Sequence, residues 1–166
     1  MHLEYFKKEI LPLKQKLYRY ARYYFKNEEQ AEDIVQDVFL KLWDKREEFN
    51  KINNIEAWCM TMTKHMVLDN LRTNRYYQID LNNNEFDDQT PDLIIEREET
   101  TKEVRTMIES LPVKQKEVII LREIEGYTYQ EIGNIMGIDQ NLVKVTLFRA
   151  RENLRKKILK TERYGL

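Results

Sequence analysis

The chain has 166 residues, which is enough for one ordinary domain or two small ones. Charged residues make up 34 % of it, with only 4 Gly and 3 Pro, so amphipathic helices are favoured over a strand-rich fold with many turns. Cys59 is the single cysteine and cannot form an internal disulfide. No signal peptide and no apolar run near the roughly 18 residues that span a bilayer are present, so we expect a cytoplasmic protein.

The net charge of −1 conceals an uneven distribution along the chain. Residues 79–103 carry nine acidic and two basic side chains, whereas residues 104–166 carry twelve basic and eight acidic ones. A near-neutral total therefore does not argue against binding to nucleic acid. The segment 78–99 also loses the apolar period of a helix, which predicts a flexible, self-repelling acidic linker.

Apolar residues at helical spacing predict three helices before this linker. The first stripe runs over residues 3–24. Pro12, which cannot donate a backbone hydrogen bond, should either kink this helix or mark its start after a frayed turn. The second helix follows Asn27, a residue type that often caps helices. The polar stretch 45–54 separates it from the third helix. Together these elements predict a small helical bundle.

After the linker, residues 128–157 contain the pattern of a helix-turn-helix. Thr128 and Glu131 have the spacing of a capping box, in which each side chain accepts a hydrogen bond from the other residue's backbone amide. Gly137 is expected to form the turn, and Asp139 can cap the next helix. A short helix, a turn with glycine and a longer helix are typical of DNA-binding domains. The fold class we predict is all-α, with two small helical domains joined by the linker.

The last helix has two contrasting faces. Apolar residues at helical spacing form a seam that should face inward, namely Val143, Leu147, Ala150, Leu154 and Ile158. The other side carries groups that can contact base edges in a major groove, namely Asn141, Lys144, Val145, Phe148, Arg149 and Arg151. Phosphate contacts are expected further along, at Arg155, Lys156 and Lys157. A merely solvated charged helix is the alternative, but an exposed Phe among basic residues is unusual on such a face.

These residues resemble a known family. Leu111-Pro112 and the segments 116–122, 125–128, 131–133 and 143–154 are similar to region four of the extracytoplasmic-function (ECF) sigma factors. Residues 31–43 resemble region two of the same family. The resemblance divides the chain into region two at 1–77, the linker at 78–99 and region four at 100–166.

The resemblance implies a transcription initiation factor that binds core RNA polymerase and directs it to promoters. Region two would bind the clamp helices of the β′ subunit and open the −10 element, and region four would contact the β flap and read the −35 element. A further implied partner is an anti-sigma factor, often membrane-bound. The resemblance implies no cofactor, no metal and no small-molecule substrate.

Site residues are carried over from the family by position. The polymerase-binding positions fall on the polar side of the second helix, at Asp33, Gln36, Asp37 and Lys41. The −10 element would be read by the polar stretch before the third helix and by that helix's exposed face, at Phe49, Asn50, Asn53, Asn54, Lys64, His65, Arg72 and Arg75. A flipped base needs stacking and hydrogen-bonding partners, which these side chains can supply.

Several assignments have alternatives. Without the resemblance, ordinary solvation would be the favoured explanation of the polar positions on the second helix, because exposed acidic residues are common on helices. His65 stands where the family often has Asn, and a structural role is an equal interpretation. Trp58 lies at core spacing and is expected to pack inside rather than stack on a base. Val145 replaces a small polar residue, so a contact with a thymine methyl is expected there instead of a hydrogen bond.

Two other classes of protein were weighed against this interpretation. A stand-alone DNA-binding regulator would share the helix-turn-helix, but it would need an N-terminal sensor with a ligand pocket rather than an exposed polar helix. An enzyme is not expected, because the sequence has no glycine-rich phosphate loop, no metal-ligand spacing and only two distant histidines.

Overall fold

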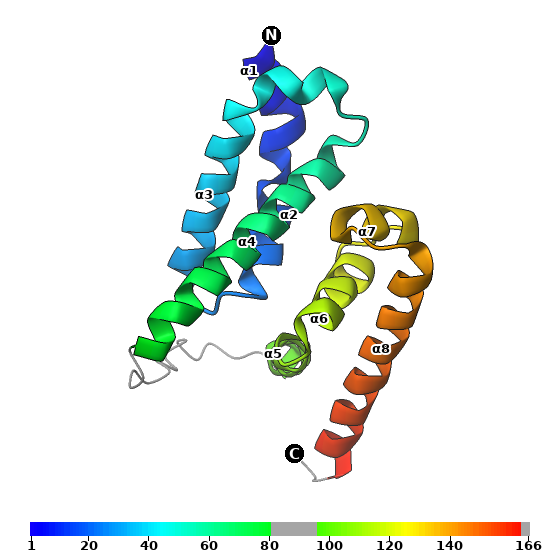
Figure 1. Ribbon diagram of the computed structural model, residues 1–166. Helices are drawn as coiled ribbons and strands as arrows, with labels where there is room; N and C mark the ends of the chain where they lie inside the picture. Colours follow the sequence, from blue (N-terminus) through cyan, green and yellow to red (C-terminus); the bar gives the residue numbers. More distant parts are fainter. Residues whose placement is uncertain (81–95, 164–166) are drawn as a thin grey trace.

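The structure is a computed structural model that describes residues 1–80 and 96–163, with side chains described for 1–73 and 102–162. Every regular element in these ranges is helical. Two helical units lie side by side, α1–α4 and α5–α8 (Figure 1). In the described part of the chain, no helix has the length and hydrophobicity to span a membrane. The predicted all-α class with two small units is confirmed.

The N-terminal unit is a bundle of helical segments. In chain order they are α1 (His2–Tyr5), the π-helix η1 (Phe6–Ile10), the 3-10 helix η2 (Leu11–Leu13), α2 (Lys14–Arg22), α3 (Glu28–Asp44), the 3-10 helix η3 (Arg46–Lys51) and α4 (Ile55–Asp80). Pro12 lies in η2, where it interrupts the α-helical hydrogen bonding as expected. Asn27 caps α3, and its side-chain oxygen accepts a 2.8 Å hydrogen bond from the amide of Glu29.

The core of this unit is mostly aliphatic along its length, with an aromatic cluster at one end. Ile10 and Leu17 are fully buried, as is the ring of Tyr20, which contacts that of Tyr24. At the η3 end, the ring of Phe6 contacts that of Trp43 edge-on, with 5.4 Å between centroids. Such edge-to-face pairs add to the free energy gained by burying the rings.

The C-terminal unit comprises α5 (Glu96–Glu109), α6 (Val113–Ile119), the π-helix η4 (Ile120–Ile124), α7 (Tyr129–Met136) and α8 (Gln140–Arg163). The capping box of Thr128 and Glu131 is present, with both reciprocal hydrogen bonds formed. Gly137 ends α7 with φ at +70°, a left-handed conformation that glycine adopts without steric cost. The predicted helix-turn-helix is therefore confirmed as α7, its glycine turn and α8.

The linker boundaries differ from those expected from composition. α4 continues to Asp80 and α5 begins at Glu96, so helix extends into the acidic segment from both ends. The remainder of the expected linker, 81–95, lies outside the described residues. The sequence also gave no indication that the two units touch, yet α4 packs against α7.

Candidate nucleic-acid interface

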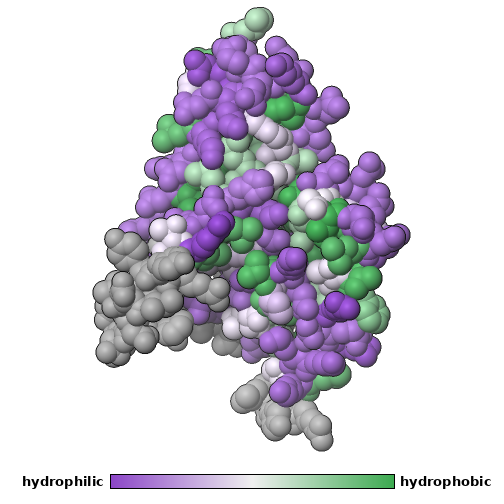
Figure 2. Space-filling model, viewed as in Figure 1, coloured by the Kyte–Doolittle hydropathy of each residue, from purple (hydrophilic) through white to green (hydrophobic). Residues whose placement is uncertain are grey.

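The predicted base-reading side chains share one exposed face of α8. Asp139 positions this helix, because its carboxylate accepts a 2.7 Å hydrogen bond from the amide of Leu142. Phe148 is 65 % exposed and Val145 44 % exposed. The flanking polar positions, Asn141, Lys144 and Arg149, are exposed as well. Figure 2 shows hydrophobic groups over α7 on a face of the molecule that is otherwise mostly hydrophilic.

The inner seam of α8 is shorter than expected. Val143, Leu147 and Ala150 are buried and Leu154 packs half-buried, as predicted. Ile158 was expected to continue the seam, but it is 40 % exposed. The last turns of α8 run past the end of α6, where the seam no longer packs against that helix (Figure 1).

Two cationic side chains lie against one aromatic ring beside the base-reading face. The sequence analysis did not predict this cluster. The guanidinium of Arg122 lies 4.5 Å from the ring centroid of Tyr129, and the ammonium of Lys144 lies 5.8 Å from it. Such cation–π contacts hold cations in place without neutralising them. The signal in the sequence was the aromatic residue in the first turn of α7, immediately after the capping Thr128.

Arg151 differs from the other predicted DNA-binding residues. Its Nε donates a 2.7 Å hydrogen bond to the carboxylate of Glu123, and a second guanidinium nitrogen also contacts that oxygen. The side chain is 51 % exposed but its charge is paired within the C-terminal unit. Arg151 therefore links η4 to α8, and it could contact DNA only if its ion pair with Glu123 were broken.

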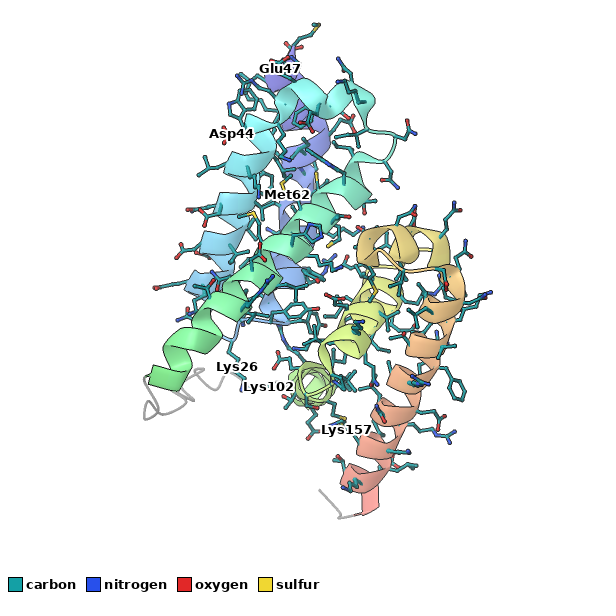
Figure 3. All side chains as sticks on the ribbon, viewed as in Figure 1. Lys26, Asp44, Glu47, Met62, Lys102 and Lys157 are labelled. Carbon is teal, nitrogen blue, oxygen red and sulfur yellow. The ribbon has the colours of Figure 1, made fainter. Side chains whose placement is uncertain are left out.

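The predicted phosphate-binding residues lie near the C-terminal end of α8. Arg155 is exposed, 3.6 Å from the carboxylate of Glu152 one turn earlier. Lys156 and Lys157 line a groove of about 610 Å³, together with Ser110, Leu111, Pro112, Asn153, Leu159 and Lys160. Lys157 lies on the side of α8 that faces α5 (Figure 3). Lys156 is exposed and Lys157 half-buried, so the two are not equally accessible to a backbone phosphate.

The predicted polymerase-binding residues form a single exposed face on α3. Asp33, Gln36, Asp37 and Lys41 are all exposed. Leu40 lies among them with 65 % of its surface exposed, and the sequence analysis missed it. It could have been found as the one large apolar residue on the polar side of the helix. Burial of this side chain by a partner would remove apolar surface from water.

Most of the predicted −10 residues are exposed on the N-terminal unit. Asn50 and Asn53 are exposed on and after η3. Asn54 is exposed too, but its side-chain oxygen accepts a 3.1 Å hydrogen bond from the amide of Ala57 at the start of α4. His65 and Arg72 are exposed on α4, and Arg72 contacts Asp69 at 2.7 Å. The side chain of Arg75 lies outside the described residues.

Two of the predicted −10 residues are corrected by the structure. Phe49 is only 3 % exposed, because η3 turns its ring inward onto Phe6, Tyr5 and Trp58. The Phe49 ring therefore anchors η3 to the core, and it is not available to stack on a base. Lys64 is 8 % exposed and its ammonium donates to the backbone oxygen of Ile135 on α7, at 3.3 Å. Contacts between distant parts of the chain bury both, and periodicity does not reveal them.

Trp58 packs against the core, as its spacing predicted, with its ring edge-on to that of Phe49 at 6.1 Å. Cys59 is fully buried beside it, and burial raises the pKa of its thiol to about 12. Within 1–73 and 102–162, no group of three His, Cys, Asp or Glu side chains could hold a metal ion.

Comparison with known proteins then assigns the chain to a family. The description "Sigma-70 region 2" matches residues 10–76, and "Sigma-70, region 4" matches residues 101–154. The RNA polymerase sigma factor YlaC of Bacillus subtilis is 30 % identical over 138 residues, covering 80 % of each chain. The ECF RNA polymerase sigma factor SigX of the same organism is 27 % identical over 150 residues, or 86 % of this chain and 77 % of SigX. The chain belongs to the ECF group of RNA polymerase sigma factors.

Two solved structures share the fold of this one. RpoE of Bartonella quintana, solved in complex with the anti-sigma factor NepR, superposes with a TM-score of 0.73 at 24 % identity, over 91 % of this sigma factor and 94 % of RpoE. CnrH, in complex with the cytosolic domain of CnrY, gives 0.70 at 20 % identity, over 92 % of this chain and 86 % of that one. At these identities the likeness establishes the fold.

Proposed function

We propose that this sigma factor directs RNA polymerase to promoters through three separate surfaces, each built from residues of this chain. The outer face of α8 contacts the −35 element. The outer face of α3 binds the core enzyme. The η3 segment and the N-terminal part of α4 contact the −10 element. The protein acts by binding and not by catalysis, in the cytoplasm where its polymerase is found.

The observation that carries this proposal is the composition of the outer face of α8. Phe148 and Val145 are exposed at the centre of a face flanked by Lys144 and Arg149. Exposing that much apolar surface to water is unfavourable, whereas a major groove offers thymine methyl groups to it. Arg149 can donate two hydrogen bonds to a guanine edge, and Lys144 can contact the same edge or a phosphate. The cations over Tyr129 add positive field beside this face.

The face of α3 supports the assignment of polymerase binding. Its four polar positions and Leu40 lie together on the exposed side of the helix. The opposite side, which packs against α2 and α4, carries the buried Ile34, Val38 and Leu42. Acidic and basic groups around an apolar centre would orient a partner, and burial of the leucine would add to the affinity.

An anti-sigma factor is a further proposed partner. The sigma factor RpoE of Bartonella quintana, which has the same fold, was solved in complex with the anti-sigma factor NepR. An inhibitor of this kind would compete for the exposed faces of α3 and α8.

Association with purified core polymerase tests the proposal directly. The wild-type chain is expected to form a complex with core enzyme, and Leu40→Asp should weaken it about tenfold or more because a charge then replaces the apolar anchor. Leu3→Asp is the matched control: Leu3 is a leucine 51 % exposed on α1, and its substitution should leave the affinity unchanged. Failure of the wild-type chain to join core enzyme, with tight binding of duplex DNA by the chain alone, would instead indicate a stand-alone regulator.

A further inference from the structure

The outer face of α8 carries an exposed apolar side chain that the base-reading residues predicted from the sequence do not include. Leu142, in the first turn of the helix, is 43 % exposed, nearly the same fraction as Val145. With the still more exposed Phe148, these side chains follow one another at intervals of three residues. Residues three apart are neighbours on a helix surface and form a row inclined to its axis. We call the row of Leu142, Val145 and Phe148 the apolar ridge.

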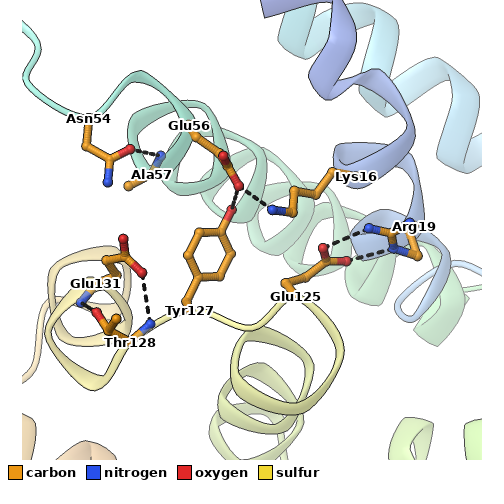
Figure 4. A network of polar contacts seen from close by, with 9 residues as sticks. All are labelled: Lys16, Arg19, Asn54, Glu56, Ala57, Glu125, Tyr127, Thr128 and Glu131. Carbon is orange, nitrogen blue, oxygen red and sulfur yellow. Dashed lines mark hydrogen bonds and ion pairs between the residues drawn. The ribbon is translucent and has the colours of Figure 1, made fainter.

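The apolar ridge stands on a rigid support. The backbone amide of Leu142 donates its hydrogen bond to the capping carboxylate of Asp139, which fixes the first turn of α8. The inner seam of α8 packs against α6 and α7. The first turn of α7 is fixed in turn, because the amide of Thr128 donates a 2.8 Å hydrogen bond to the carboxylate of Glu131 (Figure 4). A partner that binds the ridge therefore has few groups of this unit left to order.

Cations flank the apolar ridge on both sides. At about 100° of rotation per residue, Lys144 lies to one side of the inclined row and Arg149 to the other, and both are exposed. The ammonium of Lys144 lies 5.8 Å from the ring centroid of Tyr129, a contact that keeps this cation beside the ridge. Two phosphate backbones border the major groove of DNA in the same way. This distribution of charge favours duplex DNA as the partner of the ridge.

The length of the apolar ridge matches a short run of base pairs. At a rise of 1.5 Å per residue, Leu142 and Phe148 are about 9 Å apart along the helix axis. Successive base pairs of B-form DNA rise by about 3.4 Å, so the ridge extends over about three of them. In helix-turn-helix complexes, residues near the N-terminus of the recognition helix contact base edges, and Leu142 occupies this part of α8.

The chemistry of the apolar ridge decides which bases it can accept. Side chains of leucine, valine and phenylalanine neither donate nor accept conventional hydrogen bonds, so they cannot pair with the polar groups of a base edge. The apolar group that the major groove presents is the C5 methyl of thymine, which either strand can supply. Covering the amino group of cytosine or the oxygen of guanine would instead bury a polar atom without a partner, which is unfavourable.

We propose that the apolar ridge makes this sigma factor select −35 elements with neighbouring thymines, whose methyl groups line one stretch of the major groove. Leu142 is then a specificity-determining residue, at the opposite end of the ridge from Phe148. Over these base pairs the preference comes from methyl groups, whereas Arg149 reads a guanine beside them through hydrogen bonds. The inference rests on the proposed function, because it requires the outer face of α8 to enter the −35 groove.

Removal of single methyl groups from the DNA tests this inference. Holoenzyme, formed from core polymerase and the full chain, first selects its −35 element from randomised promoter fragments. Each thymine of the selected element is then replaced by deoxyuridine, which pairs in the same way and lacks only the C5 methyl group. We expect holoenzyme binding to weaken about fourfold for each methyl lost within a run of about three base pairs, because each methyl is buried against the ridge. Thymines elsewhere in the element should tolerate the replacement.

Alanine variants locate the individual contacts. Leu142→Ala should abolish the effect of deoxyuridine at one end of this run, and Phe148→Ala should abolish it at the opposite end. Leu159→Ala is the matched control, because it makes the same substitution at a leucine that is 54 % exposed in the last turns of the same helix. It should leave every methyl effect at its wild-type size. All three side chains are exposed, so the variants should keep the fold, which thermal melts verify.

The inference is overturned if the selected element has no neighbouring thymines on either strand, or if deoxyuridine has no effect at any of them. It is equally overturned if Leu142→Ala shows the same methyl effects as the wild type. Sequence-specific binding that ignores methyl groups would indicate a protein as the partner of the ridge, and it would leave the proposed function standing. Holoenzyme without any sequence preference at the upstream element would refute the proposed function and the inference together.

Discussion

At the scale of single residues, the structure separates side chains that can reach DNA from those held within the protein. Lys144, Arg149 and Phe148 are exposed on α8, whereas Arg151 is paired with Glu123. The helical period predicted the first three, because which face of a helix is buried follows from apolar spacing. It could not predict the pairing of Arg151, since Glu123 lies 28 residues away and meets it only in the folded unit.

Arg149→Ala should remove base readout at one position. We expect it to cost about 1–3 kcal/mol of binding free energy and to relax the sequence preference at a single −35 base pair. Lys156→Ala is the comparison, because loss of a phosphate contact should weaken binding to all sequences and flatten its salt dependence. Binding of polymerase holoenzyme to −35 duplexes of varied sequence and salt concentration measures both. A loss for Arg149→Ala that is the same for every sequence would refute its role.

Glu117 should make the stability of the fold depend on pH. Burial raises its pKa above the ordinary 4.5, although Lys64 from α4 and Lys114 and Lys116 from its own helix act in the opposite direction. Tyr20 and Tyr24 of α2 also face it electrostatically. The folded state therefore binds the proton of Glu117 more tightly than the unfolded state does. The stabilising contribution of this proton to the free energy of unfolding is fully present below pH 4.5, and it is lost as pH rises through the raised pKa.

Glu117→Gln removes that dependence, since the amide stays neutral. The melting temperature of the variant should rise relative to that of the wild type as pH increases from about 4.5 to 7. Glu56, whose pKa is lowered, works in the opposite sense and stabilises less as pH falls, so Glu56→Gln is the control with the reverse slope. Thermal melts across this range measure the difference. Parallel melting curves for Glu117→Gln and the wild type would contradict the account.

At the scale of secondary-structure elements, residue types and their spacing predicted most of the helices and helix caps. The Asn27 cap, the interruption of the α-helix at Pro12 and the capping box of Thr128 are local, and each appears where residue type and spacing placed it. The segment 45–54 was less predictable. Its polar composition suggested an open loop, but η3 forms there and turns Phe49 into the aromatic core. The only apolar residues in this stretch, Phe49 and Ile52, are too few to define a period, so the orientation of the Phe49 ring is set by tertiary packing.

The helix-turn-helix depends on a close approach between Gly133 and the turn. A Cβ added at Gly133 would lie 2.7 Å from the backbone oxygen of Ile138. Gly133→Ala should therefore destabilise the C-terminal unit by about 1–3 kcal/mol, despite the better helix propensity of alanine. Asn134→Ala, at the exposed neighbouring position of α7, should cost little or nothing. Denaturant unfolding compares the two, and equal stabilities would show that the turn can relax.

At the scale of the whole molecule, the sequence predicted the parts but not their assembly. Composition and period predicted two helical units with an acidic segment between them, and the resemblance predicted their order. The contact between the units was not foreseeable, because the pairs that make it join residues 71 or more positions apart and carry no local pattern. That contact also explains why Lys64 is buried, although the helical period predicted it on the exposed face of its helix.

The central claim is that this chain gives RNA polymerase its promoter preference through contacts at two separated DNA elements. The most direct measurement is transcription by core polymerase, with and without the chain, from a library randomised at both elements, followed by sequencing of the transcribed templates. The account predicts chain-dependent transcripts whose templates share preferred sequences at both elements, with Arg149→Ala relaxing one position of the upstream element alone. Transcription no greater than that of core enzyme, or templates without a shared sequence at either element, would contradict it.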